Sequence, residues 1–269
     1  MTNLANALYN IRLLDDLAKK NTPIHALHPL VKLLTTVIYL AVVMSFGRYE
    51  ISKLLPFIFF PLVVALLAEL PLMPIVHRLL MVLPLIIGIG ILNPIIDNQT
   101  ITILGVDFSR GWLTFFSLFI KCIVSVSAGI ILIATTGMNR LAVAMRMLKI
   151  PKIFVLQLLL TYRYITVLME EFLRMTQAYS LRAPNQNGIS KNNWGSFAGQ
   201  LILRTFDRAE RVYQAMLLRG FTMEYHVGMI EKANINDFAY FTGWSLFFVI
   251  AKIYNLPLFF ESLITGVVK

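Results

Sequence analysis

The sequence has a single cysteine and few charged side chains. Its one cysteine, Cys122, excludes an intrachain disulfide. Charged residues make up only 14% of the 269 residues, whereas soluble domains contain roughly 25%. Hydrophobic residues make up 58%, and the mean hydropathy is +0.72. Because long apolar runs accompany this composition, the sequence predicts an integral membrane protein embedded in a lipid bilayer.

The common motifs of catalysis are also absent. No G-x-x-x-x-G-K-[ST] run occurs, and H-E-x-x-H, C-x-x-C and G-x-S-x-G are missing too. We therefore expect that the chain is not an enzyme, does not hydrolyse ATP itself, and needs no cofactor. A self-sufficient secondary transporter typically has inverted repeats and ionisable residues near the middle of the membrane. Only Lys121 meets the second condition, so that class is a weaker alternative.

Basic residues are in excess, with a net charge of +10. Nucleic-acid binding is one interpretation, but the positive side chains border apolar runs, which favours anchoring at the cytoplasmic face of a membrane. Residues 140–232 contain 13 of the 24 Lys and Arg residues but only 6 of the 14 Asp and Glu residues. The positive-inside rule therefore places this block in the cytoplasm.

The apolar runs predict an all-α membrane protein with about five spans and a cytosolic module of amphipathic coupling helices. The spans are expected at about 30–46, 54–68, 79–96, 112–135 and 238–254. Pro71 and Pro74 are expected to close the second span, and residues 97–110 form a polar loop with a possible short hairpin. Residues 153–171 connect two basic segments, so we expect them to run along or dip into the membrane.

Three domains follow from this division. Residues 1–137 form an N-terminal membrane domain, 138–232 the cytosolic module and 233–269 a C-terminal span. Within 1–137, Leu4, Leu8, Ile11 and Leu14 indicate a short amphipathic helix before the first span. Residues 140–152 carry four basic residues and no acid, which is typical of an amphipathic helix at the membrane surface. The N-terminus is expected inside the cell and the C-terminus outside.

Two helices of the basic block are expected to end in an arginine beside a helix breaker. The first ends in Leu181-Arg182-Ala183, because Pro184 cannot continue a helix and pushes Ala183 out of the α region. The second, about 196–218, ends in Leu218-Arg219-Gly220, since glycine is the usual residue for a left-handed helix end. Either arginine could serve only to favour the helix dipole, by about 0.3–1 kcal/mol. Two equivalent tips in one cytoplasmic block favour docking onto a partner instead.

Several stretches in order along the chain form a distinctive set: Thr22–Leu34, Leu92–Asp97, Arg110–Trp112, Thr135–Leu141, Leu160–Tyr164, and Arg204–Met216 running into Leu218–Phe221. In these motifs the chain resembles the transmembrane T component of energy-coupling-factor transporters, in the cobalt and nickel branch (the CbiQ family). The resemblance covers nearly all of the chain.

The resemblance implies a scaffold that joins two ATP-binding-cassette ATPases to a separate membrane subunit that captures the substrate. It assigns ATPase docking to Leu181, Arg182, Ala183, Leu218, Arg219 and Gly220, which match the family's two x-Arg-x motifs. Many members have alanine before the arginine, whereas this chain has leucine at both positions. The implied cargo is cobalt or nickel, or alternatively another micronutrient such as a vitamin.

Three further side chains allow more than one interpretation. His25 and His28 share a helical face, but Pro29 and the lack of a third ligand disfavour a metal site, and the resemblance places the metal on the capture subunit. Lys121 lies inside a predicted span, where a buried cation is expensive. It could meet Glu69, Asp97 or a partner subunit, or extend to the membrane surface.

The topology can be tested by cysteine labelling in intact cells. Because the block 140–232 is predicted to be cytoplasmic, cysteines at Gln186 and Lys191 should be shielded from a membrane-impermeant reagent, while one at Asn98 should react. Labelling of Gln186 from outside would contradict the five-span model.

Overall fold

The computed structural model describes residues 15–48, 50–96, 100–103, 106–183, 188–221 and 234–253. These divide into two compact units. One, which we call the α3 unit, comprises the described parts of 17–137 and 231–269. The other, the α10 unit, comprises the described parts of 1–16 and 138–230. The helix predicted around Leu4–Leu14 lies outside the described residues, and the membrane or cytosolic placement of the predicted domains stays a prediction.

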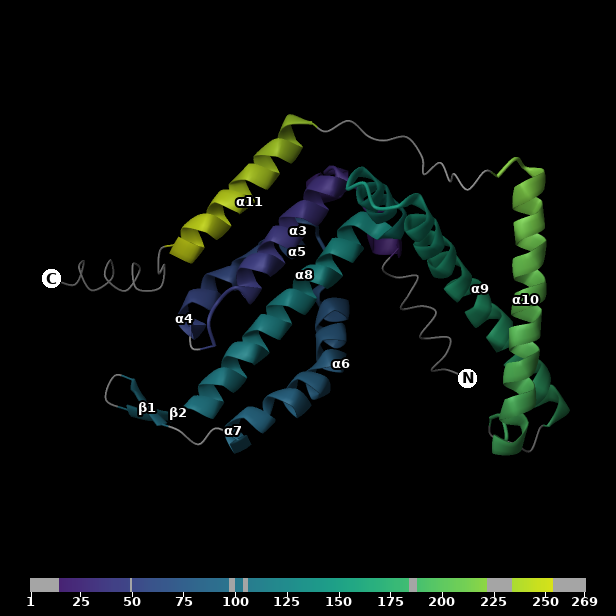
Figure 1. Cartoon of the computed structure of the whole chain (residues 1–269), viewed down its shortest axis with the longest axis horizontal. Coiled ribbons are helices and arrows are strands. Elements are labelled where there is room, and N and C mark those ends of the chain that lie inside the picture. Colours follow the sequence, from purple (N-terminus) through teal and green to yellow (C-terminus); the bar gives the residue numbers. More distant parts are fainter. Residues whose placement is uncertain are drawn as a thin grey trace. The chain divides into compact units, whose positions relative to one another are not determined.

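The α3 unit consists of helices and one short β-hairpin (Figure 1). Its elements are α2 (Pro23–Ala26), α3 (Pro29–Met44), α4 (Ile51–Leu54), the 3₁₀ helix η1 (Leu55–Ile58), α5 (Phe59–Leu67), α6 (Leu72–Gly90), α7 (Leu92–Ile96), β1 (Thr100–Ile103), β2 (Val106–Ser109), the first part of α8 (Arg110–Met147) and α11 (Ile235–Ile253). The strands are antiparallel and pair Thr100 with Ser109 and Ile103 with Val106. The hairpin expected in the loop 97–110 is thus present.

An aromatic cluster packs α3 against η1, α5 and α11, and α11 lies alongside α3 (Figure 1). Tyr39 of α3 is fully buried, and its ring centroid lies 4.5 Å from that of Phe60 and 5.2 Å from that of Phe248. The Tyr39 hydroxyl donates to the carbonyl of Phe57 at 2.8 Å. The ring therefore contributes packing area while its polar end is satisfied. This arrangement holds the N-terminal and C-terminal apolar helices together.

Several helix boundaries differ from the sequence expectation. Pro71 and Pro74 do not close the second span; they begin α6, where a missing amide donor costs nothing in the first turn. Pro84 lies inside α6 without ending it. At the end of α6, a Cβ on Gly90 would lie 2.8 Å from the Phe115 ring, so glycine lets α6 approach α8 closely there.

The α10 unit contains the rest of α8, then α9 (Lys152–Arg182), the 3₁₀ helix η2 (Lys191–Asn193) and α10 (Trp194–Leu218). The amphipathic helix expected at 140–152 ends earlier, at Met147. Lys149 there has a φ of 61°, and Pro151 precedes the first turn of α9. The segment 153–171, expected to run along or dip into the membrane, is part of one continuous helix, α9, of 31 residues.

Three of the described helical segments are long and apolar enough to cross a membrane: Leu72–Ile95, Arg110–Met147 and Lys152–Arg182. The helices Pro29–Met44 and Ile51–Leu67 are apolar but shorter. The fold is therefore that of an all-α membrane protein with one small hairpin. The order and number of crossings stay predictions, and α9 has the length and composition for a crossing.

Gly137 interrupts α8 with φ 71° and ψ 157°, a conformation that essentially only glycine adopts. A Cβ at this position would also lie 3.1 Å from the Cβ of Ala18. The chain passes from the α3 unit to the α10 unit immediately after this residue. The glycine thus permits the change of backbone direction between the two parts of α8.

We expect Gly137→Ala to destabilise the protein by about 1–3 kcal/mol, because alanine is strained in this region of φ and ψ. The measurement is the midpoint of thermal unfolding in detergent. Gly88→Ala is the control, since Gly88 lies inside α6 with open space around it and alanine favours a helix by about 0.5–1 kcal/mol. Equal midpoints for the two variants would contradict the strain at Gly137.

Candidate functional site

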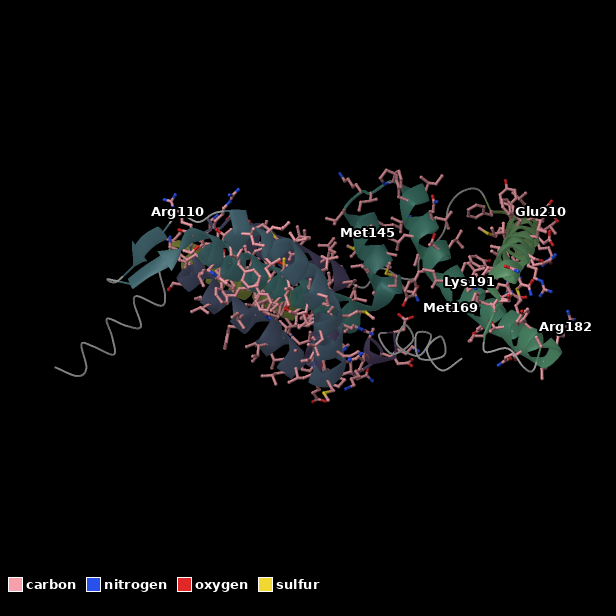
Figure 2. All side chains as sticks on the ribbon, turned by 90° about the horizontal axis from the view of Figure 1, so that it is seen from below. Arg110, Met145, Met169, Arg182, Lys191 and Glu210 are labelled. Carbon is pink, nitrogen blue, oxygen red and sulfur yellow. The ribbon has the colours of Figure 1, made fainter. Side chains whose placement is uncertain are left out.

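The first predicted tip is the C-terminal end of α9. Arg182 is its last residue, and Figure 2 shows it at the end of that helix. Ala183 leaves the helix with φ −131° and ψ 69°, while its amide still donates to the carbonyl of Tyr179 at 3.0 Å. Leu181 is 84% exposed, and Arg182 is exposed as well. The helix therefore ends where Pro184 predicts.

The second predicted tip is the C-terminal end of α10. Gly220 adopts a φ of 76°, its amide donates to Leu217, and the amide of Phe221 donates to Met216. These two bonds form a Schellman motif, which satisfies carbonyls that the helix end leaves without a partner. Arg219 is the residue that ends the helix, and Leu218 before it is 90% exposed. The left-handed helix end that Gly220 predicts is therefore present.

Two contacts join the end of α9 to the beginning of α10. The Phe172 and Phe197 rings pack edge to face with centroids 5.2 Å apart. The Asn193 amide donates to the Tyr179 hydroxyl at 3.0 Å. Tyr179 lies one turn before Arg182, and Asn193 immediately precedes α10. The Arg182 tip therefore lies near the first residues of α10, whereas Arg219 follows its last.

The length of α10 separates the two tips. Its 25 residues extend over about 37 Å at 1.5 Å per residue. Among the described residues, neither Arg182 nor Arg219 has a salt-bridge partner. Two exposed guanidinium groups are therefore presented at opposite ends of one helix.

The basic face of α10 forms an ion pair with the neighbouring helix. The spacing of Arg204, Asp207, Arg208 and Arg211 allows ion pairs along α10 itself. Arg204 instead donates across to Glu171 of α9 at 2.7 Å, and Glu171 also meets Arg174 at 3.2 Å. A groove of about 290 Å³ lies beside this pair, lined by residues of α9 and α10 that include Arg208 and Arg211. Arg204 thus joins two helices and is not a purely solvated side chain.

The α3 unit contains a buried cation that sequence reasoning missed. Lys32, in the first turn of α3, is 3% exposed, and its Nζ donates to the Thr135 carbonyl at 2.8 Å and the His25 carbonyl at 3.5 Å. Thr135 lies just before the break in α8 at Gly137. The last carbonyls of a helix cannot all bond within it, and they carry partial negative charge. They therefore offset a burial cost of several kcal/mol for the ammonium group.

A buried carboxylate joins α11 to the same region. Asp237 is 4% exposed in the first turn of α11. One of its oxygens accepts from the His28 amide at 2.7 Å, and the other accepts from the Asn234 amide at 2.6 Å. In the sequence, Lys32 and Asp237 are marked only as a lysine and an acid in the first turns of two apolar runs. Nothing in the sequence indicates that the two turns lie near one another.

The two histidines have structural partners. The His25 Nδ1 lies 2.7 Å from the Thr22 hydroxyl, and the His28 Nδ1 accepts from the Leu30 amide at 3.2 Å. Burial, and then the positive charges of Lys32 and Lys20, hold the pKa of His25 below its usual value of 6.5, opposed by backbone hydrogen bonds with Leu17 and Ala134. His25 is therefore neutral in the folded protein at neutral pH.

Lys121 of α8 binds backbone carbonyls beyond the end of another helix, α3. Its Nζ donates to the Phe46 carbonyl at 2.6 Å and to the Gly47 carbonyl at 3.4 Å, just beyond α3. The carboxylate of Glu69 is not the partner, while Asp97 lies outside the described residues. It is Lys20 that binds at Glu69, through the backbone carbonyl at 2.8 Å. The intramembrane lysine thus satisfies backbone groups within its own chain.

A family model for cobalt transport proteins, CbiQ, matches residues 20–227. The chain belongs to the CbiQ cobalt transport protein family. The match includes Lys32, Gly137 and both arginine tips, but not Asp237. With the apolar helices, it makes the chain a multi-pass membrane component of cobalt-related transport, a transporter component rather than an enzyme.

Two proteins of Methanocaldococcus jannaschii, both named as uncharacterized, are similar to this CbiQ-family chain. One is 26% identical over 226 residues, which is 78% of this chain and 75% of the relative. The other is 30% identical over 135 residues, about half of each chain. Within the described part of the CbiQ-family chain, no group of three or more His, Cys, Asp and Glu residues is placed to hold a metal ion.

The neutral state of His25 predicts a stability change with pH. Because the unfolded chain takes up the proton first on acidification, this contribution is complete above pH 6.5 and falls as the pH drops towards the lower folded pKa. Thermal unfolding in detergent should show a smaller loss between about pH 7.5 and about pH 5.5 for His25→Gln than for the parent protein. His77, exposed on α6, is the control, and His77→Gln should leave the pH difference unchanged. An unchanged loss in His25→Gln would contradict the prediction.

Proposed function

We propose that the chain is the energy-coupling scaffold of an ATP-binding-cassette importer of the energy-coupling-factor type. It would join two ATPase subunits to a membrane subunit that captures cobalt or nickel. The α10 unit would lie in the cytoplasm, as the excess of basic residues in 140–232 predicts. ATP hydrolysis in the partners would move the two tips, and the connected membrane helices would reorient the capture subunit.

The observation that carries this proposal is the pair of exposed arginines at opposite ends of α10. A helix-capping role would explain each arginine alone, but would not require leucines beside them to be 84% and 90% exposed. Arginine is among the side chains enriched at the energetically dominant positions of interfaces, and each of these arginines is next to an apolar side chain that could be buried with it. Arginine suits such a contact because its planar fork binds a carboxylate through two hydrogen bonds.

The separation of the two tips supports docking onto two separate ATPase subunits. About 37 Å of helix lies between them, so each tip can enter a separate subunit of an ATPase pair. The exposed apolar face of α10, which includes Ile202, Phe206 and Tyr213, provides further unpartnered surface between the tips. A self-sufficient transporter is disfavoured because Lys121, its candidate ionisable residue, is bound to backbone carbonyls. The match to cobalt transport proteins favours cobalt over a vitamin as cargo.

The tips can be tested by substitution in the purified complex. Losing one partner of a buried charged pair costs about 2–5 kcal/mol, so Arg182→Ala or Arg219→Ala should reduce ATPase retention and cobalt uptake. The double variant should release the ATPases more completely. Arg→Lys should rescue only in part, because lysine lacks the planar fork. Retention on the tagged chain in detergent, at matched expression, is the measurement.

Arg208→Ala is the matched control, since Arg208 is exposed on the same helix and is distant from both tips. Arg204 is not a suitable control, because its bond to Glu171 joins α9 to α10. Full ATPase retention and full uptake in the double variant would reduce both arginines to helix caps and end the docking proposal.

A further inference from the structure

The chain passes between its two units at 16/17, 137/138 and 230/231. On the α3 unit, described residues near each passage interact with the short segment that contains His25, His28 and Lys32, which we call the polar clamp. The His25 ring interacts with the backbone of Leu17, just after the first passage. Lys32 binds the Thr135 carbonyl, just before the second.

The third passage reaches the polar clamp through α11. Asn234, the first described residue after it, donates its amide to Asp237, and Asp237 accepts the His28 amide. Both hydrogen bonds are short, and Asp237 is buried. Segments far apart in the sequence therefore converge on the residues around the start of α3.

Lys32 acts at the second of these passages. Its ammonium group is buried and donates to the Thr135 carbonyl, near the end of the first part of α8, and to the His25 carbonyl in α2. If the first part of α8 moved away from α3, the ammonium group would lose the Thr135 carbonyl and that carbonyl would lose its donor. Both losses are unfavourable in an interior that excludes water. The end of the first part of α8 is thereby tied to the first turn of α3.

We propose that Lys32 is the positioning residue through which movement of the α10 unit reaches the membrane helices. Because Lys32 binds Thr135, a displacement that reaches the end of the first part of α8 moves α3 together with α8. His28 and Asp237 extend the same displacement to α11. This inference rests on the proposed coupling function.

The chain offers a matched control for the chemistry of Lys32. Lys121 binds the carbonyl of Phe46 at the opposite end of the same helix pair, away from the three passages. Both lysines donate to a backbone carbonyl at a helix end, and both join α3 to α8. A purely structural role predicts the same consequences for the loss of either ammonium group, whereas a role in coupling predicts a difference.

The experiment uses the chain reconstituted in proteoliposomes with its co-purified ATPase and capture subunits. Two quantities are measured: Co²⁺ imported per ATP hydrolysed, and the thermal unfolding midpoint of the complex. Lys32→Met and Lys121→Met should both lower the midpoint. Only Lys32→Met should lower the import ratio, by at least about fivefold, the lower end of typical coupling between sites.

Asp237→Asn supplies a second variant, because it weakens the α11 branch of the polar clamp while keeping the side-chain volume. It should lower the import ratio in the same direction, and it decides the question if Lys32→Met does not assemble. An import ratio that is unchanged, or reduced equally in the Lys121 variant, would overturn the role of Lys32. Absence of ATP-driven import by the parent complex would instead overturn the proposed function.

Discussion

The bond between a lysine ammonium group and a carbonyl at a helix end is the interaction on which the α3 unit depends. A membrane interior offers no water to the carbonyls that a helix leaves without partners. Lys32 binds at the end of the first part of α8, Lys121 just beyond α3, and Lys20 just beyond α5. Lys32 lies in the first turn of α3 and binds near the end of the first part of α8, whereas Lys121, from the middle of that part, binds just beyond the C-terminal end of α3. The two segments therefore run antiparallel.

In the α10 unit, the basic side chains pair with a carboxylate or are exposed, rather than binding backbone carbonyls. Arg204 and Arg174 share Glu171, which joins α9 to α10. Arg182 and Arg219 are exposed at helix ends without a salt-bridge partner among the described residues. In the α3 unit the lysines stabilise the fold by binding backbone, whereas in the α10 unit the two terminal arginines remain available to another molecule. This contrast agrees with a membrane part that holds position and a coupling part that docks.

Local signals predicted the helix ends of the candidate site well. Pro184 and Gly220 act on their own neighbours, so the ends of α9 and α10 follow from backbone sterics alone. The break in α8 at Gly137 was not predicted; the fourth span was only expected to end at about residue 135. In the apolar runs, proline was a less reliable signal for where a helix ends. Pro71 and Pro74 are as compatible with the first turn of a helix as with the region after its end, and the structure has them at the start of α6.

The amino-acid sequence by itself determined the membrane character, the basic block, the two arginine tips and the family resemblance, because each depends on composition or on residues close in sequence. Only the tertiary structure decided the partners of Lys32, Lys121, Arg204 and Asp237. The bond from Lys32 to Thr135 and that from Asp237 to His28 join residues from distant helices. A lysine in an apolar run has the same local pattern whether it extends to the membrane surface or binds another helix. Packing selects between these outcomes, since the ammonium group binds whichever unsatisfied carbonyl the fold brings within reach.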